Sequence, residues 1–293
     1  MLSGWLIGQR RVRIILFTEV IANAAHIALD LALVLWVGCG IAGVAVATAG
    51  SELLKLALLT AAVARVPAAS RALAAIGQRA TWSATALRLL FSLNRDLFLR
   101  TLLLTVAMLL LARIGAQQGP VVLAANGILF QIFLLSSLIV DGFESAAQVL
   151  CGEARGSGHR DGFVVVLRAA LIWAFVTGVL IGIVYIFAGG ALAASFSTNY
   201  EVIAATASYI GWTGLLAVLG VFVSVFDGVF VGAGWTRAML LTMVGAMAIY
   251  AAALQLTGPL DNNGVWLAFS LLFVARSAGQ LCLLPGLIRR DLG

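Results

Sequence analysis

Charged side chains are scarce in this sequence: they make up 10% of its 293 residues, whereas hydrophobic residues make up 62%. Soluble globular domains carry about 25% charged residues. Together with a mean hydropathy of +1.09, this scarcity excludes a soluble globule. The sequence therefore predicts an integral membrane protein.

Patterns that would indicate other classes of protein are also missing. Cys39, Cys151 and Cys282 are far apart and form no CxxC or metal-binding spacing, so we predict neither a disulfide nor a metal site. Alternating strands of about ten residues, which are typical of membrane barrels, are not seen. The sequence contains no nucleophile and base pattern and no phosphate-binding loop. An enzyme is therefore not expected, and neither is a cofactor.

Eight apolar stretches have the length of about 20 residues that a membrane-spanning helix needs. Each span must satisfy its own backbone hydrogen bonds, so we expect α-helices. The stretches lie near residues 13–37, 40–64, 97–115, 121–150, 163–188, 203–232, 238–258 and 264–288. The predicted fold is an all-α integral membrane protein with about eight transmembrane helices.

Arginine placement predicts the orientation, because Lys and Arg accumulate in short cytoplasmic loops. If the loops alternate between the two sides, one side has only Arg113. The other side collects thirteen arginines: Arg10, Arg11, Arg13, Arg65, Arg71, Arg79, Arg88, Arg95, Arg155, Arg160, Arg237, Arg289 and Arg290. This asymmetry puts both termini in the cytoplasm. The net charge of +6 is thus an orientation signal, and no nucleic-acid partner is expected.

The segment at residues 227–237, DGVFVGAGWTR, has a similar segment at residues 4–13, GWLIGQRRVR. Internal repeats are typical of secondary transporters, and this one predicts that roughly 130 residues of a first half would precede Met1. Chance similarity is the alternative, because the shared residue types are common. The matches pair Gly228 with Gly4, Gly232 with Gly8, Arg237 with Arg13 and, further along, Gly43-Val44 with Gly264-Val265.

The chain is predicted to have three parts. Residues 1–65 hold two helices that remain of an amino-terminal lobe, and residues 97–293 hold a carboxy-terminal lobe of six helices. Between them, residues 66–96 combine spaced arginines with Ala, Ser and Trp. This composition predicts a cytoplasmic amphipathic helix that links the lobes.

Acidic residues inside the spans are candidates for function, because an ionisable group at membrane depth costs roughly 2.5–3.5 kcal/mol on insertion scales. Asp30 lies deep in the first span, on the same helical face as Asn23 and His26. A desolvated carboxylate beside an imidazole can exchange a proton. We therefore predict a cation-coupling or proton-coupling site at Asp30. A helix–helix hydrogen bond that only holds packing is the alternative.

The other acids allow more than one interpretation. Glu52 precedes Lys55 by three residues, a spacing that suits a pair on one helix. Glu144 lies near the cytoplasmic end of its span, where water could solvate it, and Glu19 lies close to the amino-terminal arginines.

Asp141 and Asp227 each precede a glycine late in a long span. These glycines predict the close approach of another helix. The aspartates either bind a cation or cationic substrate in a cavity or cap a neighbouring helix end, and the sequence leaves both roles open.

Six segments, taken in order, resemble the multidrug and toxic compound extrusion (MATE) family in its DinF-like branch. They are NAAHIALD at 23–30, GIAGVAVAT at 40–48, NRDLFLRTLLL at 94–104, VLAANGILFQ at 122–131, DGFESAAQVLCGEARGSG at 141–158 and DGVFVGAGWTRAM at 227–239. Members of the family have twelve helices in two lobes of six. The resemblance implies that this chain holds the last two helices of the amino-terminal lobe and the whole carboxy-terminal lobe.

The resemblance also implies roles for individual residues. Asp30 and Thr48 match two positions of a cation or proton site. His26 stands where the family often has an asparagine, and a first-helix aspartate that completes the family's site is not in this sequence. A substrate cavity is expected in the carboxy-terminal lobe at Asp141, Glu144, Gln148 and Asp227, where Gln148 replaces an expected glutamate.

The function implied is secondary active multidrug efflux, in which alternating access exchanges cationic or amphipathic compounds for H+ or Na+. The expected location is the inner (plasma) membrane of a bacterium or archaeon. One alternative is a lipid or polysaccharide flippase of the same superfamily, but a flippase favours a cavity lined by Arg and Lys, and the deep charges here are expected to be mostly acidic. The other is an inactive fragment without its first four helices, unless an upstream segment supplies them.

Overall fold

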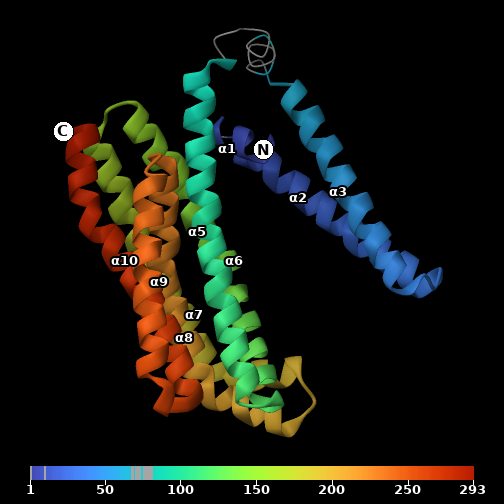
Figure 1. Ribbon diagram of the computed structural model, residues 1–293. Coiled ribbons are helices and arrows are strands. Elements are labelled where there is room, and N and C mark those ends of the chain that lie inside the picture. The colour runs from blue at the N-terminus through green and yellow to red at the C-terminus, as the bar shows by residue number, and fades with distance from the viewer. Residues whose placement is uncertain (1, 10, 67–68, 70–73, 75–81) are drawn as a thin grey trace. The chain divides into compact units, whose positions relative to one another are not determined.

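The computed structural model describes residues 2–9, 11–66, 69, 74 and 82–293 (Figure 1). Every regular element in these ranges is a helix. Eight of the helices are long and apolar enough to cross a membrane. The structure therefore confirms the predicted all-α fold, and the eight spans coincide with the eight apolar stretches.

The contacts divide the chain into two units, Met1–Arg88 and Leu89–Gly293. Much of the predicted linker, including Arg71 and Arg79, lies outside the described residues, as does Arg10. The last part of the predicted linker is already helical, because α5 spans Ala84–Gln117. The amphipathic character of the linker therefore stays a prediction.

The first unit consists of α1 (Leu2–Gly8), α2 (Val12–Asp30), the π-helical turn η1 (Leu31–Trp36) and α3 (Gly40–Ala64). The chain turns between η1 and α3 at Gly38 and Gly40, whose φ angles of 73° and 53° favour glycine. The helix α2 packs along α3. A small core around Leu6, Leu59 and Val66 joins α1 to this pair.

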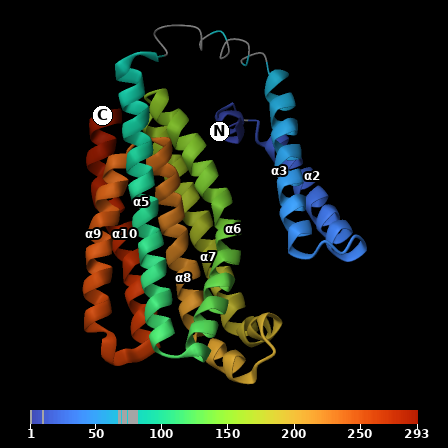
Figure 2. The same ribbon diagram turned by 45° about the vertical axis from the view of Figure 1, so that its right-hand side comes forward.

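The second unit continues from α5 with α6 (Pro120–Gly156), α7 (Arg160–Phe196) and α8 (Tyr200–Gly232). It ends with α9 (Thr236–Leu256), the short turn η3 (Gly258–Leu260) and α10 (Asp261–Leu292). The most buried of the spans is α8, which packs against α6, α7 and α10 (Figures 1 and 2). Asn199 is the N-cap of α8, and its side chain accepts a hydrogen bond from the backbone N–H of Glu201 at 2.9 Å.

The helices α6 and α8 approach closely where α8 carries glycines four residues apart. A Cβ atom on Gly228 would lie 2.2 Å from the carbonyl oxygen of Glu144, and one on Gly232 would lie 2.1 Å from that of Gln148. The predicted close approach is confirmed for Gly228. It is wrong for Gly142, where an added Cβ would meet nothing within 4 Å.

The residues matched in the repeat occupy equivalent places in their helices. Arg13 is the second residue of α2 and Arg237 is the second residue of α9. Gly43 and Gly264 are each the fourth residue, of α3 and α10. These positions agree with an internal repeat that relates α2 and α3 to α9 and α10.

A buried amide pair joins α6 to α10 on the side of the second unit that holds the large aromatic core. Asn126 donates to Asn262 at 2.8 Å and accepts from it at 2.9 Å. The indole N–H of Trp266 also donates to the Asn126 oxygen, at 2.9 Å. Tyr250 and Phe269 pack beside Trp266 in the same core. This polar contact fixes how α10 lies against α6.

Candidate functional site

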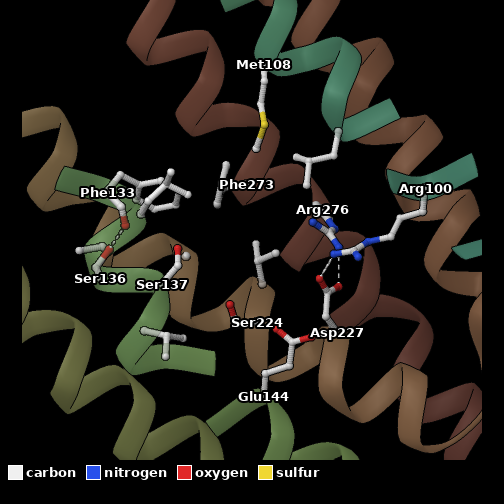
Figure 3. Close-up of a pocket in the computed structure, with 16 residues that line it drawn as sticks. Arg100, Met108, Phe133, Ser136, Ser137, Glu144, Ser224, Asp227, Phe273 and Arg276 are labelled. Atoms are coloured by element: carbon white, nitrogen blue, oxygen red, sulfur yellow. Dashed lines mark hydrogen bonds and ion pairs between the residues drawn. The ribbon is translucent and has the colours of Figure 1, made fainter. Parts of the chain in front are cut away.

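The second unit contains a cavity of about 160 Å3 that is lined by side chains from α5, α6, α8 and α10 (Figure 3). One part of its wall is apolar, with Met108, Phe133 and Phe273. The other part holds four ionisable side chains, which are Arg100, Glu144, Asp227 and Arg276. Ionisable side chains within helices of this length are costly in a membrane unless they are paired or hydrated.

Asp227 is the centre of this cluster and is only 2% exposed. Arg276 donates from Nη2 to both of its carboxylate oxygens, at 2.5 Å to Oδ1, and Arg100 donates to Oδ2. Gln280 donates to Oδ1 at 3.1 Å. Both guanidinium groups converge on the carboxylate in Figure 3. Asp227 therefore accepts hydrogen bonds from side chains of α5 and α10 rather than from the free N–H groups of a helix end.

The cluster has a positive charge left over. Two guanidinium groups meet one carboxylate, and the side chain of Arg276 is 4% exposed. The Nε atoms of Arg100 and Arg276 are buried and have no hydrogen-bond partner within the described part of the chain. Glu144 points toward Asp227 from α6 (Figure 3). An ionised Glu144 would balance the remaining charge of the cluster.

Arg100, Arg276 and Gln280 were not among the predicted site residues. A signal for the two arginines was present, because each lies inside an apolar stretch and a buried cation needs a partner as much as a buried acid does. The expectation that the deep charges are mostly acidic is wrong for this cavity, where two arginines face two acids.

The four residues predicted to line a substrate cavity are placed differently. Asp227 and Glu144 line the cavity described above, and Glu144 is half-buried. Asp141 and Gln148 lie on the same helix as Glu144, but they are exposed and are not among the residues that line this cavity. A contribution of Asp141 and Gln148 to substrate binding stays a prediction.

In the first unit, α2 and α3 bring together three of the four predicted coupling residues. His26 Nε2 lies 3.4 Å from Asp30 Oδ2 and 3.1 Å from Thr48 Oγ1. The Thr48 hydroxyl donates its one proton to the carbonyl of Val44 at 2.9 Å, so it accepts from the imidazole. In that arrangement the imidazole N–H at Nε2 donates to Thr48, and Asp30 Oδ2 lies at ion-pair distance from the same nitrogen.

The two carboxylate oxygens of Asp30 have different surroundings. Asp30 Oδ1 is buried and has no hydrogen-bond partner among the described residues. Asn23 donates to the carbonyl of Glu19 within α2, at 2.9 Å, and not to Asp30. The π-helical turn η1 begins directly after Asp30. Such insertions occur often at functional sites, and the sequence pattern did not predict this one.

Lys55 pairs across the two helices rather than along one. Its Nζ atom lies 2.7 Å from Glu19 Oε1. The predicted pair of Glu52 with Lys55 is therefore wrong, because the packing of α3 on α2 brings a carboxylate from the neighbouring helix to the lysine. Glu52 is exposed. Among the described residues, no group of three or more His, Cys, Asp or Glu side chains is placed to hold a metal ion.

Comparison with known proteins gives consistent matches. A family profile described as MatE matches residues 96–257. The chain is similar to the DNA damage-inducible protein F of Escherichia coli (strain K12), with 30% identity over 275 residues, which are 94% of this chain and 60% of that protein. It spans less than two thirds of that relative.

Solved structures match over almost the whole chain. A crystal structure of MATE in complex with MaD3S has a TM-score of 0.86 at 18% identity and covers 98% of this chain and 65% of that one. An outward-facing multidrug resistance MATE family transporter of the MOP superfamily has a TM-score of 0.84 at 17% identity, over 98% of this chain and 65% of that one. At this identity the structures show a shared fold.

Proposed function

The chain belongs to the MATE family, and on this premise we propose that it carries out secondary active efflux of cationic or amphipathic compounds in exchange for H+ or Na+. The family consists of transporters rather than enzymes. In this proposal, the two lobes alternate between states that open to opposite sides of the membrane. The protein works in the inner (plasma) membrane, with both termini in the cytoplasm.

The contact of His26 with Asp30 and Thr48 is the observation that carries the proposal. Asp30 places Oδ2 3.4 Å from His26 Nε2 and keeps Oδ1 buried, without a hydrogen-bond partner among the described residues. A small cation at Oδ1 would pair with that atom, and a proton there would remove the negative charge of Asp30. Binding there would also weaken the attraction of Asp30 for His26 on the same helix, and His26 is the residue that contacts Thr48 on α3. A state that holds the contact of His26 with Thr48 would then differ in its affinity for the proton or cation from a state that does not. Differential binding of this kind is what exchange requires.

The cavity of the second unit supports the substrate part of the proposal. Glu144 lines it and, unlike Asp227, has no recorded ion pair within the described residues. A second, apolar cavity of about 310 Å3 lies between α5 and α6, and Met108 lines both cavities. An amphipathic substrate would place its charged group near Glu144 and its apolar body against Met108 and Phe130. Asp141 and Gln148 remain proposed contacts on α6.

Ethidium efflux from a strain without its major pumps tests this function. The chain would be expressed as it is and with any coding sequence that a search upstream of Met1 finds in the same reading frame. Asp30→Asn is expected to reduce efflux to the background, because it removes the charge that a proton or cation would neutralise. Glu52→Gln removes an exposed acid of the same unit and is expected to leave efflux unchanged. Reversing a pH gradient or a sodium gradient in membrane vesicles then identifies the coupling ion.

Two results would overturn the proposal. Efflux that persists in Asp30→Asn would remove this residue from coupling. No efflux by either form, with membrane insertion verified, would favour the inactive fragment that the sequence left open as an alternative.

A flippase for anionic lipids or lipid-linked polysaccharides is the second candidate. The observation that favours it is the pair of arginines in the cavity, Arg100 and Arg276, whose buried Nε atoms lack partners in the described structure. Fluorescent phosphatidylglycerol in vesicles that contain the protein separates the candidates. Flipping that depends on Arg100 and is indifferent to Asp30 would favour the flippase.

A further inference from the structure

A third cavity, of about 430 Å3, lies at the end of the second unit that carries the carboxy terminus. Its walls come from α5, the end of α6, the turn between α8 and α9, the start of α9 and the end of α10. Four arginines line it: Arg95, Arg155, Arg237 and Arg290. None of them belongs to the cavity around Asp227.

Two of these arginines are held in place by Asp291. Arg155 Nη2 donates to Asp291 Oδ2 at 2.7 Å, and Arg290 Nε donates to Oδ1 at 2.7 Å. The indole N–H of Trp235 donates to Oδ2 as well, at 2.8 Å, and the guanidinium of Arg155 lies 6.0 Å from the centre of the Trp235 ring. These contacts hold the guanidinium groups of Arg155 and Arg290 at the rim of the cavity without the help of a ligand.

The cavity keeps an excess of positive charge. Arg95 pairs with Asp96 at 2.8 Å, so Asp96 and Asp291 are the carboxylates that face the four guanidinium groups. Arg237 is exposed and has no ion pair recorded within the described ranges. Within the described residues, two of these positive charges are therefore left without a counter-charge, and Arg237 is the guanidinium that has no ion pair there.

The rest of the wall is apolar. Leu241 lies one helical turn after Arg237 on α9, and Leu283 and Leu287 precede Arg290 on one face of α10. Leu241 and Leu283 are 60% and 41% exposed. The arginines thus form the end of the cavity nearest the helix termini, and the leucines line the part that extends along the helices. A free anion would use only the arginines, whereas a phospholipid would use both parts.

We propose that this cavity binds an anionic phospholipid, with the phosphodiester at Arg237 and its neighbouring arginines and an acyl chain along Leu241, Leu283 and Leu287. Basic pockets between membrane helices on the cytoplasmic side suit anionic headgroups. The fork of a guanidinium group matches the geometry of a phosphate. The proposal does not depend on the transport function, because the site lies outside the cavity around Asp227.

Native mass spectrometry of the purified chain in detergent tests the proposal. Phosphatidylglycerol is expected to remain bound at lipid concentrations where phosphatidylcholine with the same acyl chains does not. Arg237→Gln is expected to weaken phosphatidylglycerol binding roughly fivefold, since each basic residue near a membrane surface contributes a factor of this size. Arg160→Gln is the matched control, because Arg160 is exposed at the start of α7 and does not line the cavity.

The outcomes separate a lipid from a simple anion. Competition by inorganic phosphate at equal concentration would show an anion site without lipid specificity and would overturn the proposal. Equal loss in Arg160→Gln and Arg237→Gln would also overturn it, because binding would then follow net charge. Leu241→Gln keeps every arginine, so it should weaken the lipid and leave phosphate unaffected. An unchanged melting temperature verifies that each variant is folded.

Discussion

Arg276 Nη2 lies 2.5 Å from Asp227 Oδ1, and both residues are buried, 3% and 2% exposed. The pair joins α10 to α8 inside the second unit, and Arg100 adds a contact from α5 to the same carboxylate. Opposite charges attract strongly in this buried environment. Each charged group is stable there only while its partners are present. Removing one member should therefore cost more than removing an exposed ion pair.

Arg276→Met should lower the free energy of unfolding by about 3–5 kcal/mol, the cost of breaking a buried pair. The reason is that Asp227 keeps its charge but loses the guanidinium that contacts both of its oxygens. Asp227→Asn in the same background should restore part of the loss. Unfolding of the purified protein in mixed micelles, followed by tryptophan fluorescence, measures these differences.

Arg113→Gln is the control for this series, because Arg113 is an exposed arginine on the same helix as Arg100. Its effect should stay within about 0.5 kcal/mol. If Arg276→Met and Arg113→Gln proved equally mild, the cluster would be a hydrated group rather than a buried pair.

Gly228→Ala should destabilise the protein by about 1–3 kcal/mol or more, as overpacking does. The added methyl would lie 2.2 Å from the carbonyl oxygen of Glu144, a backbone atom that cannot move without shifting α6. Gly211→Ala tests the same exchange on the same helix at a position where the methyl would meet nothing within 4 Å. That variant should be neutral or more stable by up to about 1 kcal/mol, since alanine favours helix. Thermal melting in detergent compares the two, and equal melting temperatures would contradict the close contact of α6 with α8.

Features set by spacing along one helix could be predicted from the sequence. The spans follow from apolar length, and the contact of His26 with Asp30 follows from their separation by one turn. Thr48 was placed near them by the family resemblance alone. No spacing rule relates Arg100 to Asp227, which are 127 residues apart. How helices rotate and pack decides such partners, and the same packing directs Lys55 to Glu19 on another helix instead of Glu52 on its own.

Glu19 and Lys55 should be energetically coupled more strongly than Glu52 and Lys55, because only Glu19 contacts the lysine directly. A double-mutant cycle with Glu19→Gln and Lys55→Gln isolates the first pair, and a cycle with Glu52→Gln isolates the second. The 2.7 Å contact joins α2 to α3 with both side chains partly exposed. A coupling of about 0.2–1 kcal/mol is typical of such a pair in water. Equal coupling in both cycles would mean that Lys55 exchanges between the two acids.

Asn126→Leu should destabilise the contact of α6 with α10, although leucine has a similar size. The exchange leaves the amide of Asn262 and the indole N–H of Trp266 buried without their partner. Each unsatisfied buried group costs about 1–3 kcal/mol. Asn263→Ala is the control, because its contact with Trp212 is exposed and water can replace it. Replacing both Asn126 and Asn262 by Leu should recover part of the loss, since only the indole then stays unpaired. Unfolding in mixed micelles measures these variants together with Asn262→Leu. A double variant that loses as much stability as the two single variants added together would show that the amides do not act as a pair.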